Sequence, residues 1–223
     1  MFHRIANDFL NTLRYFDIVR RCSIYTDDEN KILYVEIPKA GCTSLKTELF
    51  FKPKYGLPKP HENIHRRLGY KKILNLSRYK NYFKFTVTRD PYARFLALFN
   101  AKLIINKVKY TGNPIQKILD SNNIQNPNDL LTFINKKVFM LNAHICPQYF
   151  LLPKNLHTLD FIGQIENMDE VNKVLSANLG KKIVIPHLNK KGYKNTFPID
   201  KDLFNFMYRK DYEIFKDRYK PLS

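Results

Sequence analysis

The residues best suited to chemistry stand together between positions 37 and 46, in the run Ile-Pro-Lys-Ala-Gly-Cys-Thr-Ser-Leu-Lys. Lys39 offers a positive charge and Gly41 allows a sharp turn. Thr43 and Ser44 begin an apolar-periodic segment, and the unpaired N–H groups of a first helical turn bind phosphate well. The run differs from a Walker A loop, in which a lysine follows the last glycine. It therefore predicts a site for a phosphate-like group that is not ATP or GTP held in the usual way.

Arg89 is a second residue that can bind an anion. It follows the apolar run at residues 83–88, and the next two residues, Asp90 and Pro91, suit the cap and the first position of a helix. A guanidinium holds phosphate through two parallel hydrogen bonds. Two anion sites, each at the end of a strand, predict a ligand with phosphate groups at two positions.

Apolar runs and helical periodicity indicate the elements that position these residues. Strands are expected at residues 31–37, 83–88 and 157–163, and residues 22–26 pair with the first of them as a hairpin. A weakly helical surface segment is expected at residues 61–80. Helices are expected, in chain order, at residues 1–21, 43–53, 92–106, 114–121, 126–138 and 168–179, with a final pair of helical segments at 201–219. This alternation predicts an α/β fold with a central, mainly parallel sheet flanked by helices, in which ligands bind outside the carboxyl ends of the strands.

Length and composition narrow the class of protein. With 223 residues, 44% hydrophobic and 14% aromatic, the chain is expected to form one domain over 1–223, with the N-terminal helix at about 1–21 packed on it. Three cysteines without a C-x-x-C pair predict neither a disulfide framework nor a zinc site. No apolar run reaches the roughly 20 residues of a membrane span. A soluble, cytoplasmic protein is therefore expected.

The net charge of +18 predicts an anionic partner. Nucleic acid, an anionic membrane, an acidic polysaccharide and a multiply phosphorylated cofactor are all compatible with it, and charge alone does not choose among them. No nucleic-acid recognition motif is visible, so a nucleic-acid partner is not expected.

Four segments, in order, resemble motifs of the membrane-associated carbohydrate sulfotransferases (family 2). Residues 37–46 resemble the 5′-phosphosulfate loop, and residues 85–99, Phe-Thr-Val-Thr-Arg-Asp-Pro-Tyr-Ala-Arg-Phe-Leu-Ala-Leu-Phe, resemble the 3′-phosphate motif. Residues 142–148, Asn-Ala-His-Ile-Cys-Pro-Gln, and 160–167, Asp-Phe-Ile-Gly-Gln-Ile-Glu-Asn, resemble two later segments. The run Tyr-Arg-Lys-Asp-Tyr-Glu-Ile-Phe at 208–215 also resembles the closing motif of the family.

The resemblance implies a P-loop-like three-layer fold and an O-sulfotransferase. The donor would be 3′-phosphoadenosine 5′-phosphosulfate (PAPS), the product adenosine 3′,5′-bisphosphate (PAP), and the acceptor a hydroxyl of a carbohydrate or glycolipid, without a metal. An acidic acceptor is favoured by the charge. Sulfuryl transfer, like phosphoryl transfer, needs in-line positioning and stabilisation of charge on the leaving oxygens.

The same resemblance implies roles for individual residues. Lys39 acts catalytically beside the oxygen that bridges phosphate and sulfuryl group, and Arg89 binds the 3′-phosphate. Contacts to the 5′-phosphosulfate are expected from the whole loop: Pro38, Lys39, Ala40, Gly41, Cys42, Thr43 and Ser44. Acceptor contacts are expected from His144 and Gln148.

One position departs from the family pattern. The family has a serine eight residues after the arginine as a donor to the 3′-phosphate, where this chain has Ala97. Arg89 then needs other donors. The candidates are Arg94, Lys190, Lys191 and Gly192.

The acceptor hydroxyl needs a general base near neutral pH, for which histidine is the first choice. His65 is the first candidate, because a related branch of 2-O-sulfotransferases carries its histidine at a similar distance before the equivalent arginine. His61 is the second candidate and His144 the third. A metal site at His61 and His65 is disfavoured, because no third ligand is apparent.

Two other functions stay open. A P-loop-type nucleotide phosphotransferase is one, although the missing Walker lysine argues against it. A non-catalytic polyanion-binding protein on a degenerate sulfotransferase fold is the other, prompted by the net charge and by Ala97.

Overall fold

The computed structural model describes residues 22–59, 62–100, 122–136, 143–186 and 198–223. The helices expected at residues 1–21 and 114–121 lie outside the described residues. Backbone contacts divide the chain into two compact units. We call the described residues of 20–89 and 151–190 the sheet unit, and those of 90–150 and 191–223 the helical unit. The single domain over residues 1–223 stays a prediction.

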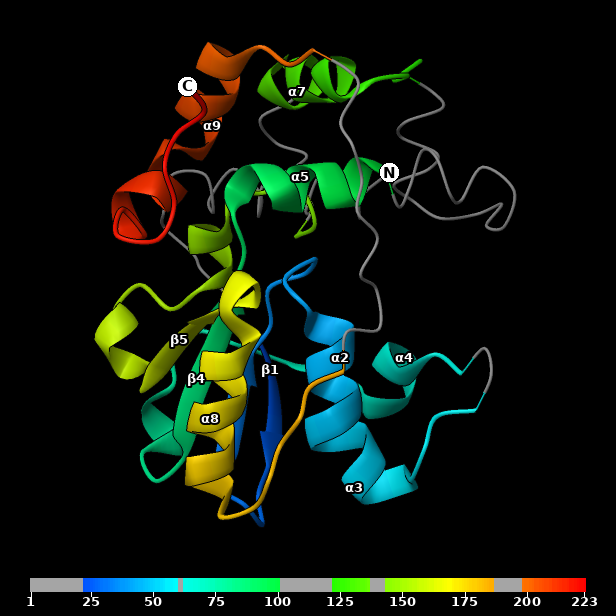
Figure 1. The fold of residues 1–223 in the computed structure, drawn as a ribbon, viewed down its shortest axis with the longest axis vertical. Coiled ribbons are helices and arrows are strands. Elements are labelled where there is room, and N and C mark those ends of the chain that lie inside the picture. Colours follow the sequence, from blue (N-terminus) through cyan, green and yellow to red (C-terminus); the bar gives the residue numbers. More distant parts are fainter. Residues whose placement is uncertain (1–21, 60–61, 101–121, 137–142, 187–197) are drawn as a thin grey trace. The chain divides into compact units, whose positions relative to one another are not determined.

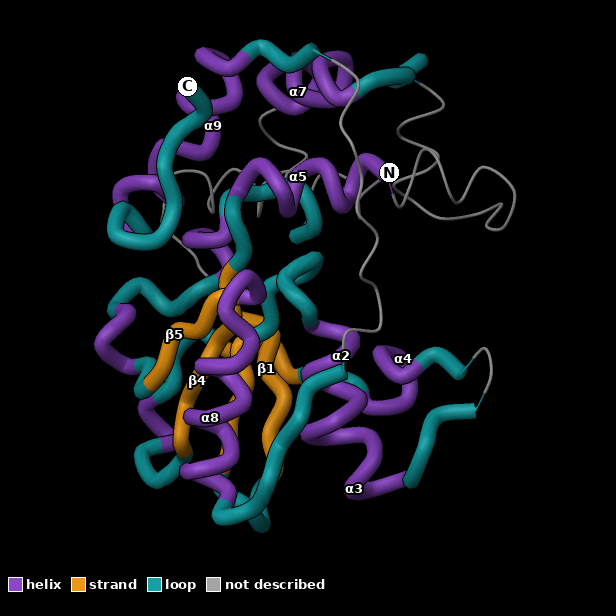
Figure 2. Tube along the Cα trace, viewed as in Figure 1, coloured by secondary structure: helices purple, strands orange, loops and turns teal. Residues whose placement is uncertain are grey.

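The described strands form one sheet in the order β3-β1-β2-β4-β5, drawn in orange in Figure 2. The bounds are Cys22–Asp27 for β1, Ile32–Val35 for β2, Lys71–Ile73 for β3, Phe83–Thr88 for β4 and Phe161–Gln164 for β5. β4 runs parallel to β2 and to β5, whereas β1 is antiparallel to both of its neighbours, β2 and β3. Every strand of the sheet except β1 therefore points the same way, which confirms the α/β fold with a mainly parallel sheet.

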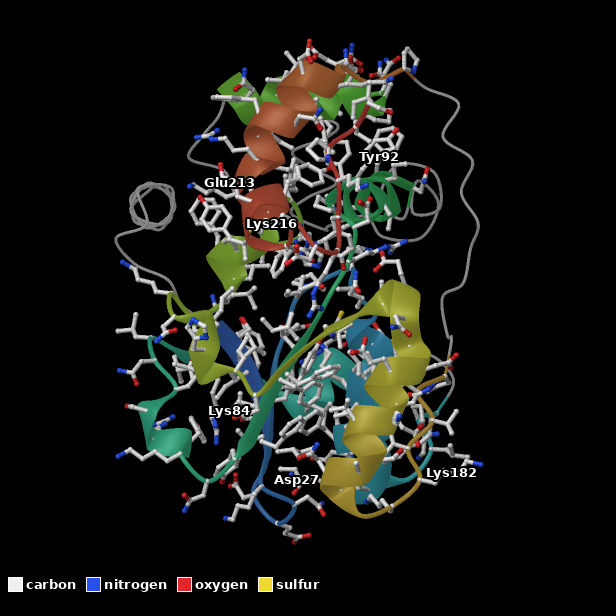
Figure 3. The ribbon with its side chains drawn as sticks, turned by 60° about the vertical axis from the view of Figure 1, so that its left-hand side comes forward. Asp27, Lys84, Tyr92, Lys182, Glu213 and Lys216 are labelled. Carbon is white, nitrogen blue, oxygen red and sulfur yellow. The ribbon has the colours of Figure 1, made fainter. Side chains whose placement is uncertain are left out.

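A side-chain turn closes the β1–β2 hairpin. Asp27, labelled in Figure 3, accepts hydrogen bonds from the backbone N–H groups of Glu29 at 3.0 Å and of Asn30 at 3.1 Å. Aspartate favours turns for this reason. The expected hairpin is confirmed, and β2 then pairs with β4 so that Val35 lies opposite Thr86.

The central strands are buried on both faces. Leu33 and Tyr34, which point to opposite faces of β2, are each 0% exposed, as expected inside a parallel sheet. The buried hydroxyl of Thr86 donates to the carbonyl of Val35 at 2.8 Å, and that of Thr88 donates to the carbonyl of Gly163 at 2.9 Å. These two bonds tie β4 to both parallel neighbours at the end where Arg89 follows.

Helix α8, Met168–Leu179, covers one face of the sheet (Figure 1). Its residues Val171 and Leu175 share a hydrophobic core with Tyr34, and Leu45 joins the same core. Gly163 permits the close approach, because a Cβ there would lie 2.6 Å from Cγ2 of Val171. The helix predicted at residues 168–179 is confirmed.

A continuous helical segment follows β2, and its end differs from the prediction. It consists of α2 (Cys42–Lys46), a π-helical turn (Thr47–Phe51) and α3 (Lys52–Tyr55). The helix was expected to end near Pro53, but it continues to Tyr55. Pro53 instead stands in the first turn of α3, where a missing N–H is tolerated, just after the wider π turn.

Residues 62–80 contain a strand that the sequence does not reveal. Helix α4 spans Ile64–Leu68, β3 spans Lys71–Ile73, and a short 3-10 turn spans Ser77–Tyr79. The expectation of a weakly helical surface segment is therefore confirmed at α4 and wrong at β3. β3 is a short edge strand with two exposed lysines, and such edges lack the apolar alternation that marks a strand.

The helical unit contains α5 (Pro91–Phe99), α7 (Pro127–Lys136) and α9 (Lys201–Ile214). Asp90 caps α5 by accepting from the N–H of Ala93 at 2.8 Å, with Pro91 in the first turn, as predicted. α5 and α9 pack through aromatic rings, with Phe95 5.5 Å from Phe204 between ring centroids. The final pair of helical segments is instead one helix followed by turns.

Short 3-10 turns connect the remaining parts, at Gln148–Leu151, Leu156–Thr158 and Ile165–Asn167. Within the described ranges, no helix is both long enough and apolar enough to cross a membrane.

Candidate functional site

The loop between β2 and α2 has the backbone of an anion cradle. The φ angle is positive at Lys39, 70°, and at Gly41, 76°, and it is not positive at Ala40 between them. The N–H of Ala40 donates to the carbonyl of Ile37 at 3.3 Å, which closes the turn. When the sign of φ alternates along a loop, successive backbone N–H groups turn to the same side. Such a concave set of N–H groups binds anions.

The start of α2 lacks the side-chain cap that α4, α5, α8 and α9 have. Asn63, Asp90, Asn167 and Asp200 cap α4, α5, α8 and α9 with a side-chain oxygen. The residue at the same place in α2 is Gly41, which has no side-chain oxygen to offer, and no side-chain cap is formed. The first-turn N–H groups of α2 are thus left for another acceptor, such as a phosphate oxygen.

The structure brings Arg89 to this loop. Because β2 and β4 are parallel neighbours, their carboxyl ends meet at one edge of the sheet. The guanidinium Nη1 of Arg89 donates to the backbone carbonyl of Lys39 at 3.0 Å. The two residues expected from the sequence to bind anions, Lys39 and Arg89, therefore lie side by side within the sheet unit.

His65 also lies beside the loop. It sits on α4, whose N-terminus is capped by Asn63 through the N–H of Arg66 at 3.0 Å. The imidazole Nε2 is 3.2 Å from Oγ1 of Thr43, and the side chain is 46% exposed. Partial burial, and then the positive charge of Lys46, lower the pKa of His65. The ring is thus neutral near pH 7, the form that a general base requires.

A buried ion pair stands behind His65. The Nζ atom of Lys46, whose side chain is 0% exposed, is paired with Oε1 of Glu36. It also lies 2.5 Å from Nδ1 of His65 and donates to the hydroxyl of Tyr25 at 3.2 Å. Reasoning from the sequence gave neither Lys46 nor Glu36 a role. The signal that was available is an ionisable residue directly after apolar ones, with Glu36 after Val35 and Lys46 after Leu45.

Cys42 is a packing residue in this site. It is 9% exposed, and burial raises the pKa of its thiol. A neutral thiol is a weak nucleophile. The cysteine therefore serves as a small residue at the start of α2, and anion binding by its backbone N–H stays a prediction.

In the helical unit, the segment that holds His144 and Gln148 is fastened by buried polar side chains. Arg94, 1% exposed, donates to the carbonyls of Cys146 and Ala143, each at 2.8 Å. These contacts give Arg94 a structural role, and its contact with the cofactor stays a prediction.

Asp211 also holds this segment through hydrogen bonds. Its carboxylate accepts from the backbone N–H of Gln148 at 2.8 Å and of Tyr149 at 2.9 Å. Tyr208 donates to the carbonyl of Ile145 at 2.6 Å. The closing motif found in the sequence thus holds the 143–149 segment in shape.

The remaining site predictions are not tested by the geometry. Gln148 is 0% exposed and His144 is partly buried, and acceptor binding by either stays a prediction. His61, Lys190, Lys191 and Gly192 lie outside the described residues. Ala97 lies in α5. Within the described ranges, no three histidine, cysteine, aspartate or glutamate residues are grouped as metal ligands.

A family model described as "Sulfotransferase family" matches residues 23–220. That match covers most of the chain and both units. The chain belongs to the sulfotransferase family. The resemblance to this family that the sequence motifs show is thereby confirmed.

Individual sulfotransferases match over shorter stretches. Carbohydrate sulfotransferase 10 of Danio rerio is 30% identical over 106 residues, which are 43% of this chain and 28% of that protein. Carbohydrate sulfotransferase 10 of Homo sapiens is 31% identical over 94 residues, 37% of this chain and 26% of that protein. Carbohydrate sulfotransferase 9 of Homo sapiens is 36% identical over 90 residues, 35% of this chain and 20% of that protein.

The matched stretches span between a fifth and three tenths of the length of these relatives. No solved structure matches the chain significantly. The match over residues 23–220 therefore establishes the family, and the similarity to named relatives is distant and partial.

Proposed function

We propose that the protein transfers a sulfuryl group from PAPS to a hydroxyl of a carbohydrate or glycolipid. The observation that carries the proposal is the hydrogen bond from Arg89 to the carbonyl of Lys39. It joins, in a member of the sulfotransferase family, the two residues that the resemblance assigns to opposite ends of the donor.

The residues present fit such a donor. The uncapped first turn of α2 and the alternating backbone of the Lys39 loop suit a 5′-phosphosulfate, and the guanidinium of Arg89 suits a 3′-phosphate. PAPS supplies an activated sulfuryl group and a phosphate leaving group. Lys39 stabilises the charge that develops on the bridging oxygen, which is the largest contribution a protein makes to transfers of this kind.

His65 is proposed as the general base. The acceptor oxygen attacks sulfur, its O–H proton passes to the imidazole, and the bond from sulfur to the bridging oxygen breaks to release PAP. The lowered pKa of His65 keeps the ring unprotonated near neutral pH. The contact between Nε2 of His65 and Oγ1 of Thr43 holds the base beside the loop that carries the donor.

The acceptor class is proposed from two observations. The relatives with the matches above are named carbohydrate sulfotransferases. The net charge of +18 favours an acceptor that is acidic.

A binding experiment tests the donor site before any acceptor is known. PAP is expected to raise the melting temperature of the protein, whereas adenosine 5′-monophosphate, which lacks the 3′-phosphate, raises it much less. Arg89→Met is expected to remove the difference between the two nucleotides. Equal stabilisation by both in the wild-type protein contradicts the proposal, and stabilisation only by ATP with magnesium indicates a phosphotransferase instead.

Transfer is then tested with PAPS that carries a radiolabelled sulfuryl group. A panel of neutral and acidic glycans and glycolipids is offered as acceptors, with Lys39→Met as the matched inactive variant. Label in a product, lost in the variant, supports the proposal. Binding of polyanions that survives Lys39→Met, with no transfer to any acceptor, indicates a non-catalytic protein.

A further inference from the structure

The charge of Lys46 is buried, and the proposed transfer gives this residue no role. Its side chain is 0% exposed, on the α2 helix that begins at the phosphosulfate loop. A buried ion pair contributes little net stability, because desolvation offsets the attraction between the charges, and an apolar pair of similar size often serves equally well. The surroundings of Lys46 therefore need another explanation.

Each partner of Lys46 can only be an acceptor. The ammonium has three hydrogens and no lone pair. Its Nζ atom contacts Oε1 of Glu36, the hydroxyl of Tyr25 at 3.2 Å and Nδ1 of His65 at 2.5 Å. The three contacts match the three hydrogens. Nδ1 of His65 must then accept through its lone pair.

This contact determines the protonation of the imidazole. A neutral ring that accepts at Nδ1 carries its hydrogen on Nε2. Nε2 lies 3.2 Å from Oγ1 of Thr43, which can accept that hydrogen. Both ring nitrogens are thus satisfied in one tautomer, and Thr43 keeps its own hydrogen to donate elsewhere.

We propose that Lys46 is a positioning residue that holds His65 in the tautomer with hydrogen on Nε2 and covers the lone pair on Nδ1. The consequence for catalysis rests on the proposed function, in which His65 is the base. The proton of the acceptor then goes to Nδ1, so that the acceptor O–H bond breaks as the N–H bond forms. The acceptor hydroxyl must first replace the hydrogen bond from Lys46. Until the acceptor binds, the lone pair on Nδ1 of His65 stays hydrogen-bonded to Lys46.

The charged groups around the imidazole agree with this assignment. Lys46 comes from α2, while Glu36 and Lys39 come from the segment after β2. The π-helical turn that packs on α4 contributes Glu48, which is paired with Lys52. Lys46 lowers the pKa of His65 more than Glu36 raises it. Removing both charges together is therefore expected to raise the pKa of His65.

The tautomer is directly measurable in the full chain labelled with nitrogen-15. Long-range proton–nitrogen spectra distinguish a protonated ring nitrogen from one with a lone pair, and His65→Gln identifies the signals of His65. The wild-type protein is expected to show the hydrogen on Nε2 at pH 7. The double variant Glu36→Gln with Lys46→Met leaves no unpaired buried charge, and it is expected to show a mixture of tautomers and a higher pKa for His65.

A second pair on the same helical segment gives a matched control. Glu48→Gln with Lys52→Met removes an ion pair of the same composition that does not touch His65. This control is expected to keep the wild-type tautomer and pKa. A hydrogen on Nδ1 in the wild-type protein overturns the proposal, and so does a folded Glu36→Gln/Lys46→Met variant with unchanged signals.

The rate of transfer gives a second readout. Since a base with a higher pKa is protonated up to a higher pH, the acid limb of the pH–rate profile is expected to move to higher pH in the double variant. A wild-type protein that shows the expected tautomer, yet neither binds PAP nor transfers sulfuryl, contradicts the proposed function and leaves the assignment of Lys46 standing.

Discussion

Lys39 holds a backbone conformation that costs most side chains free energy. Its φ of 70° places Cβ close to the following carbonyl, a strain of about 1–2 kcal/mol for a residue other than glycine. A glycine at this place would remove the strain and the ammonium together. A lysine held in this glycine-like conformation fits a side chain required for chemistry.

Two substitutions at this residue separate strain from charge. Lys39→Ala and Lys39→Gly both remove the ammonium, and each is expected to lower the rate of sulfuryl transfer by about 10²–10³-fold. Lys39→Gly is expected to be the more stable of the two by about 0.5–1 kcal/mol, because glycine adopts a positive φ without steric cost. Urea unfolding followed by far-ultraviolet circular dichroism measures the difference. An alanine variant as stable as the glycine variant contradicts the strain argument.

Individual residues were predictable where their type and spacing matched a motif. Lys39, Gly41 and Arg89 were found because a strand followed by a loop or a turn fixes their place at the edge of a parallel sheet. The Lys46–His65 contact could not be found in this way. It depends on how α4 packs against α2, and α4 comes after a connection that contains two prolines and a glycine.

At the scale of elements, α9 acts on the 143–149 segment through one carboxylate. Asp211 is 0% exposed, and burial raises its pKa to about 6, although the N–H groups of Gln148 and Tyr149 and the charge of Arg94 favour the ionised form. An aspartate in the unfolded chain has a pKa of about 3.9. The folded protein therefore binds this proton more readily than the unfolded chain does.

The sign of the resulting pH dependence follows from that difference. The contribution of Asp211 to the free energy of unfolding is fully present below about pH 4 and is lost as the pH rises to about 6, by roughly 3 kcal/mol. Asp211→Asn is expected to be less stable than the wild-type protein at pH 4, because one backbone N–H loses its acceptor, at a cost of about 1–3 kcal/mol. Its free energy of unfolding is also expected to lack the fall between pH 4 and 6.

Urea unfolding of both proteins at pH 4, 5, 6 and 7 measures this effect. Tyr212→Phe serves as a control on the same helix, because it retains the carboxylate. Parallel pH curves for the wild-type protein and Asp211→Asn contradict the assignment.

Elements were predictable where their pattern was strong. The hairpin, β4 and α8 were found from apolar runs and helical periodicity. The helix after β2 was predicted to end too early, at Pro53, because residue types do not reveal a π-helical turn. β3 was missed because an exposed edge strand is held by backbone bonds to β1 and has little apolar pattern of its own.

At the scale of the whole molecule, net charge is the dominant property. A formal charge of +18 raises the local concentration of anionic acceptors over a distance of about 10 Å at 0.1 M salt. Transfer to an acidic acceptor is therefore expected to depend strongly on ionic strength. Raising the salt from 0.05 to 0.5 M is expected to lower kcat/KM for an acidic glycan about tenfold, and that for a neutral glycan less than twofold.

Comparison of the two acceptors in parallel isolates the steering effect, because both reactions use the same donor and the same base. Equal salt dependence for the two contradicts a role of the net charge in acceptor choice.

The α/β class and the mainly parallel direction of the sheet followed from the alternation of predicted strands and helices. The division into a sheet unit and a helical unit did not follow, because no composition change along the chain marks the boundary at residue 90.

The hydrogen bond from Arg89 to the Lys39 carbonyl is expected to make the two halves of the proposed donor site thermodynamically dependent on each other. We expect a change at Arg89 to loosen the loop that is proposed to hold the 5′ end, and a change in the loop to redirect the guanidinium. Losses of affinity from the two positions are then non-additive, as for residues in direct contact generally. If Ala97 leaves the proposed 3′-phosphate contact weak, the proposed 5′-phosphosulfate end of the site is then expected to be weakened as well.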